Sequence, residues 1–113
     1  MVRKYSILII VLSLFFIKKS VSIESAAHEA ELAKCLGVFM TIKNNDFNQK
    51  YKNVADNVLT VYKEKIRRLK SSQMTKEMSA KGAKIIESYN IQKMNNDINN
   101  LLNSCIMTFR VGN

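Results

Sequence analysis

Apolar residues recur every three or four positions through most of the chain after residue 22, which is the spacing of one face of an α-helix. The first such segment runs from about Glu24 to Ile42. Its inward stripe consists of His28, Leu32, Cys35, Phe39 and Ile42. Small residues form a second stripe beside it, made of Ala26, Ala30, Ala33 and Gly37. Small side chains let a neighbouring helix come close, so this stripe predicts tight packing within the chain, with a dimer face as the alternative.

A polar break follows at residues 43–46, where Asp46 is a suitable N-cap for the next helix. The second segment runs from Phe47 to about Lys70. Its face is broad, which is typical of a bundle helix rather than of a narrow coiled-coil seam. The residues on this face are Phe47, Tyr51, Val54, Val58 and Val61, widened by Leu59, Tyr62, Ile66 and Leu69.

Residues 71–73 form a second break, and a third segment runs from about Met74 to Glu87. The break near Tyr89 and Asn90 is faint, so the third and fourth segments could form one long helix. The inward positions of the fourth segment are Ile91, Met94, Ile98, Leu101, Cys105 and Phe109. The pattern predicts an all-α fold, a small antiparallel bundle of three or four helices with short connections.

The first 22 residues have the pattern of a secretory signal peptide. A basic start at Arg3 and Lys4 precedes the apolar run Ile7–Ile17, and small residues stand before a cut after Ser22. The alternative is a retained membrane anchor, although the run is short for the hydrocarbon core of a bilayer. We therefore expect a signal peptide over 1–22 and a single helical domain over 23–113. The protein is then exported, to the periplasm or the extracellular space, or is anchored by its N-terminus in the alternative interpretation.

The two cysteines fall on inward stripes of the first and last segments. In an up-down-up-down bundle these helices are antiparallel neighbours, so Cys35 and Cys105 can meet. A small exported chain with two cysteines favours a disulfide between them, and two buried free thiols are the alternative. The chain has no Cys-x-x-Cys sequence of the kind found in redox-active pairs.

Composition narrows the function classes. The 113 residues include no Pro and three Gly, too few turn residues for a β-sandwich and too few for a glycine-rich phosphate loop. Two Cys and one His cannot form a closed Cys/His zinc site. His28 is the sole histidine base, and the carboxylates after Glu31 are scattered singly. A haem held by His28 and Met107 is disfavoured by their expected register. We therefore expect no enzyme activity, no metal and no cofactor.

The strongest surface feature is a basic stretch from Lys63 to Lys84, with eight basic and two acidic residues. Four of the 18 basic residues lie in the first 22, so residues 23–113 carry 14 basic and nine acidic residues and a net charge of +5. The stretch could simply be a solvated helix end. Its functional interpretation is a face that docks an acidic partner. The candidate binding residues are Lys63, Lys65, Arg67, Arg68, Lys70 and Lys76.

These observations favour a small exported binding module that caps, inhibits or sequesters another protein through its basic face. One alternative is a membrane-associated protein that keeps its N-terminal segment and binds anionic lipid surfaces. A further alternative is a periplasmic stress chaperone. Nucleic acid is not an expected partner, because an exported protein seldom meets it and no aromatic residues alternate with the bases for stacking.

Overall fold

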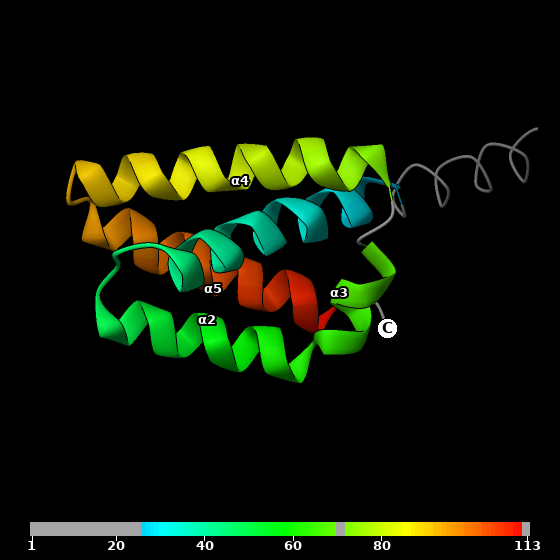
Figure 1. Cartoon of the computed structure of the whole chain (residues 1–113), viewed down its shortest axis with the longest axis horizontal. Helices are drawn as coiled ribbons and strands as arrows, with labels where there is room; N and C mark the ends of the chain where they lie inside the picture. The colour runs from blue at the N-terminus through cyan, green and yellow to red at the C-terminus, as the bar shows by residue number, and fades with distance from the viewer. Residues whose placement is uncertain (1–25, 70–71, 112–113) are drawn as a thin grey trace, which may run out of the picture.

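The computed structural model describes residues 26–69 and 72–111, and these residues form helices joined by short turns, with no strand among them (Figure 1). The first helix occupies residues 26–44 and carries no label in the figure. It is followed by α2 (Gln49–Val61), α3 (Lys63–Leu69), α4 (Gln73–Ile91) and α5 (Asn95–Arg110). The predicted all-α bundle is therefore confirmed, with α3 as a short addition to four long helices. The expected signal peptide, residues 1–22, lies outside the described residues.

The second predicted segment is divided in two. Its N-cap is Asn48 rather than Asp46, because the Asn48 side chain accepts a hydrogen bond from the backbone N–H of Lys50 at 3.0 Å. A turn at Tyr62 then ends α2, and α3 leaves it in a new direction (Figure 1). The helical face therefore stops at this turn, and Val61, expected to point inward, is 63% exposed.

The break between the last two helices lies later than the sequence indicated. Helix α4 begins at Gln73, one residue before the expected Met74, because the Ser72 hydroxyl caps it by accepting from the Thr75 N–H at 3.1 Å. It continues to Ile91, and the chain turns at Lys93, whose φ of 55° lies in the left-handed region. The inward assignment of Ile91 is therefore wrong: this side chain is 80% exposed at the end of α4.

The first helix forms the centre of the bundle (Figure 1). Between residues 32 and 42, every residue except Lys34 and Met40 is buried. Such burial extends around the helix instead of following one face, because other helices pack on several sides of it. The expected inward positions Leu32, Cys35 and Phe39 are confirmed, and Leu36 and Val38 join them in the core.

Helix α4 runs parallel to this central helix and touches its backbone. The Ser79 hydroxyl donates to the Ala33 carbonyl at 2.9 Å, and the Asn90 amide donates to the Asp46 carbonyl at 3.2 Å. Both pairs are separated by similar numbers of residues, so the two chain segments advance in the same direction. At the crossing, a Cβ atom on Gly37 would collide with the carbonyl oxygen of Ser79. Ala33 and Gly37 of the small-residue stripe are therefore packed within the chain, as the sequence predicts, whereas Ala26 is exposed.

A disulfide joins the central helix to α5. Cys35 and Cys105 are bonded with a Cα–Cα distance of 5.3 Å, and each is 1% exposed. Beside the disulfide, the rings of Phe39 and Phe109 have centroids 6.0 Å apart. The predicted disulfide is confirmed, and it lies in the middle of the core. A structural disulfide is compatible with an oxidising compartment.

Candidate partner-binding surface

Two residues of the expected basic face line one pocket. Lys63 and Arg67 stand one turn apart on α3 and border a hollow of about 330 Å³ between the central helix, α2 and α3. This hollow and its lining form the basic pocket. The lining residues are Met40, Lys43, Leu59, Lys63, Ile66 and Arg67.

The basic pocket combines an apolar floor with a cationic rim. Ile66 is 6% exposed at its base, whereas Met40 is 37% exposed and remains accessible to a ligand. Lys43, Lys63 and Arg67 provide three positive charges, and none of the described lining residues is acidic. An apolar group flanked by carboxylates would match this arrangement, because its apolar surface would leave water while its charges remain compensated.

Arg67 has one anionic neighbour, which does not prevent it from binding a ligand. Its guanidinium lies 2.8 Å from the carboxylate of Glu64, one turn away on α3, and both side chains are mainly exposed. Exposed ion pairs contribute only about 0–1 kcal/mol to stability, so a ligand carboxylate can replace Glu64 at low cost.

Lys65 belongs to the same helix but has a different role. Its ammonium donates to the Phe109 carbonyl at 2.6 Å and to the Val111 carbonyl at 3.4 Å. It also lies 5.7 Å from the centre of the Tyr62 ring. A cation at these carbonyls satisfies acceptors at the end of α5 and interacts favourably with its helix dipole. Lys65 thus joins α3 to α5 and does not border the basic pocket.

The other expected residues are more dispersed. Arg68 on α3 and Lys76 in the first turn of α4 are exposed, and neither lines the basic pocket. Lys70 lies outside the described residues. The structure therefore brings Lys63 and Arg67 together, separates Lys65 from them, and adds a residue that sequence reasoning missed, Lys43.

Met40 and Lys43 come from the last turns of the central helix, where the sequence showed an inward stripe ending in a polar break. The available signal was their spacing of three residues, which puts them on one face of a helix. That spacing does not reveal which distant segment lies opposite. The contribution of the central helix to the pocket depends on its position against α2 and α3.

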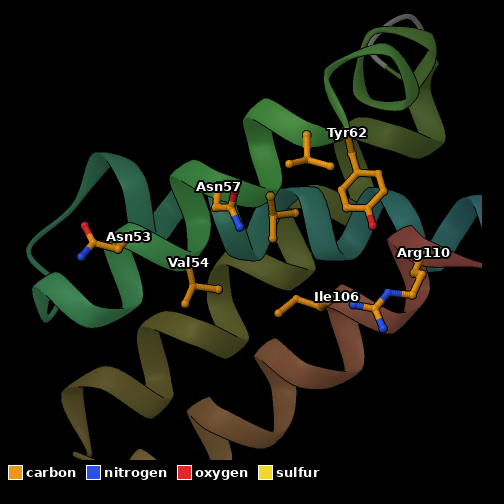
Figure 2. A pocket seen from close by; sticks show the side chains of 8 residues that line it. Asn53, Val54, Asn57, Tyr62, Ile106 and Arg110 are labelled. Carbon is orange, nitrogen blue, oxygen red and sulfur yellow. The ribbon is translucent and has the colours of Figure 1, made fainter.

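A second, larger groove lies on another side of α2, between α2 and α5 (Figure 2). Its volume is about 550 Å³. This site is the α2–α5 groove. Its lining residues are Asn53, Val54, Asn57, Val58, Val61, Tyr62, Ile106 and Arg110.

The described ranges lack the features of a metal centre and of a membrane span. His28 is half-buried on the central helix, and its Nε2 atom has no hydrogen-bond partner among the described residues. Over residues 26–69 and 72–111, no three His, Cys, Asp or Glu side chains gather where they could hold a metal ion. None of the helices in those same ranges has the length and apolar character needed to cross a bilayer.

Comparison of the chain with protein-family models, curated proteins and solved structures gives no match. The function is therefore inferred from the chemistry of the two sites.

Proposed function

We propose that the protein is a small exported, non-enzymatic helical module that captures another protein through the basic pocket. The observation that carries this proposal is the combination of three cationic side chains with an apolar floor at one concave site. The matching partner feature is an acidic surface segment with a protruding apolar side chain. Binding there would cap or sequester the partner without any covalent chemistry.

The construction of the pocket supports this proposal. Its walls come from the central helix, α2 and α3, and the buried disulfide fixes the central helix to α5. A site formed by packed helices loses little conformational freedom when a ligand binds, which favours affinity. The concave shape suits a protruding side chain better than the flat surface of a lipid bilayer. Anionic lipid binding, the alternative from the sequence, is therefore made a separate arm of the test.

The test compares charge reversal inside and outside the pocket. The tagged protein is purified from its own host without reductant. Its mass is then measured under native conditions, which shows whether a polypeptide is bound. The test variant carries Lys63→Glu and Arg67→Glu. The matched control carries Lys50→Glu and Lys81→Glu, two exposed lysines outside the pocket, with the same total charge change.

We expect the wild type and the control to retain one acidic polypeptide at fixed stoichiometry. The pocket variant should bind the isolated polypeptide at least about tenfold more weakly, because reversed rim charges repel its carboxylates. If the pocket variant binds the polypeptide as tightly as the wild type, the proposal is contradicted. An equal loss of affinity in the control variant would contradict it as well. Sedimentation of the wild type with phosphatidylglycerol vesicles, but with no polypeptide, would instead favour the membrane alternative.

A further inference from the structure

The α2–α5 groove is mainly apolar along its length. Val54, Val58 and Val61 come from α2, and Ile106 faces them from α5 (Figure 2). Val58 is 4% exposed at the base, while Val61 is 63% exposed at the edge. The volume of about 550 Å³ is within the range of small-molecule sites. Burying a hydrocarbon chain against these side chains would remove apolar surface from water, which favours binding.

The two ends of the groove differ in charge. Tyr62 and Arg110 lie at one end, and Asn53 lies at the other (Figure 2). Lys65 adds a second cation near the first end, because its ammonium lies against the Tyr62 ring. The opposite end has a neutral amide, and none of the described lining residues is acidic. The groove is thus mainly apolar, with the Asn57 amide beside its middle and a positive charge at one end only.

We infer that the α2–α5 groove binds a single-chain anionic amphiphile, with its head group at Arg110 and its alkyl chain along the valines of α2. The groove follows α2 from Asn53 to Tyr62, a helical rise of about 13 Å, which suits an alkyl chain of medium length. The Arg110 guanidinium can donate paired hydrogen bonds to a carboxylate or a phosphate. The Tyr62 hydroxyl points toward Arg110 and could donate to the same head group (Figure 2).

Charge favours this occupant over a second copy of the chain. Residues 23–113 carry a net charge of +5, so two copies repel each other at long range. No carboxylate within the described residues pairs with Arg110, whereas an anionic head group would neutralise it directly. The site is separate from the basic pocket, so this inference does not depend on the proposed function.

The first test uses probes that share a twelve-carbon chain but differ in the head group. Each probe competes with a fluorescent fatty acid for binding to the full-length protein, at concentrations below those at which the probes form micelles. The four probes are dodecanoate, dodecyl phosphate, dodecanol and dodecyltrimethylammonium. We expect an anionic probe to displace the fluorescent ligand at concentrations about tenfold or more below those of dodecanol and the cation. The better anion then distinguishes a fatty acid from a phosphate head group. Equal displacement by dodecanol, or no binding of the fluorescent ligand, would overturn the inference.

The second test locates the head group and the chain. Arg110→Gln should weaken dodecanoate binding about tenfold and leave dodecanol unchanged, whereas Arg110→Lys should retain most of the affinity. Val61→Asp should weaken the binding of every probe, because it places a charge beside the hydrocarbon chain. The matched controls are Arg68→Gln and Ile91→Asp, two exposed sites outside the groove. Thermal unfolding checks that each variant is folded. Unchanged dodecanoate binding by folded Arg110→Gln and Val61→Asp would place the ligand elsewhere and refute the assignment.

Discussion

Lys65 illustrates how neighbouring residues of one type can take different roles. It shares α3 with Lys63, Arg67 and Arg68, and its formal charge is the same as theirs. Its ammonium nevertheless donates to the Phe109 carbonyl across 44 residues of sequence, while Lys63 and Arg67 border the basic pocket. A lysine that satisfies a helix end contributes to stability, and one at an open rim remains available for a ligand.

Replacing this cation should destabilise the protein. We expect Lys65→Met to lower the free energy of unfolding by about 1–2 kcal/mol, because a charged donor to the end of α5 is lost. The matched change Lys63→Met should stay within about 0.5 kcal/mol, since Lys63 is exposed and makes no such bond. Urea unfolding followed by circular dichroism measures both. Equal effects of the two substitutions would contradict the capping role.

The central helix and α4 cross at very short range, with no room for a side chain at two glycines. Gly37 on one helix faces the Ser79 carbonyl, and Gly82 on the other faces the Lys34 carbonyl. Each helix thus provides a glycine where the other backbone passes. Glycine normally weakens a helix interior by about 1 kcal/mol relative to alanine, so its presence at both positions reflects the need for space.

The crossing predicts a reversal of the usual helix preference. Gly37→Ala should lower the free energy of unfolding by about 1–3 kcal/mol, because the added methyl group forces two backbones apart. At Ala80, an exposed position of α4, the opposite change Ala80→Gly should also destabilise, by about 1 kcal/mol, through propensity alone. Alanine is therefore unfavourable at residue 37 and favourable at residue 80. A more stable Gly37→Ala protein in urea unfolding would show that the helices do not cross at this glycine.

The disulfide acts on the whole molecule, because it connects the central helix to the last helix. The two cysteines are 70 residues apart in sequence, so the bond encloses most of the described chain. In the chain-entropy model, closing such a loop stabilises the folded state by about 4 kcal/mol, chiefly by restricting the unfolded chain. A domain of this size has a small core, so a contribution of that size is a large part of its stability.

Removing this bond should leave the fold marginal. We expect the Cys35→Ala/Cys105→Ala double variant to lose about 4 kcal/mol of unfolding free energy, with a steeper dependence on urea because its unfolded chain is more expanded. Reducing the wild type should give a similar loss, which controls for the two missing sulfur atoms. Calorimetry and urea unfolding, with and without dithiothreitol, make the comparison. Unchanged stability in both cases would mean that packing alone holds α5 to the central helix.

The helical class and the cysteine pairing were accessible from the sequence for a simple physical reason. The period of apolar residues depends on helix geometry, and it is the same whichever partner covers the apolar face. Cys35 and Cys105 each lay on such a stripe. The positions of the turns were less accessible: α2 ends at Tyr62, and α4 continues past Asn90 to Ile91. Local periodicity continues through both points, while the turns depend on where neighbouring helices end.

The candidate sites depend on contacts between segments that lie far apart in the chain. The sequence grouped Lys63, Lys65 and Arg67 by proximity along one helix, and it assigned Lys43 to a break. Packing of the central helix against α2 and α3 brings Lys43 to Lys63 and Arg67, and packing of α5 takes Lys65 away. Side-chain periodicity identifies which residues face inward. Helix crossing, register and the direction of each helix decide which residues meet, because those quantities arise only when all the helices pack together.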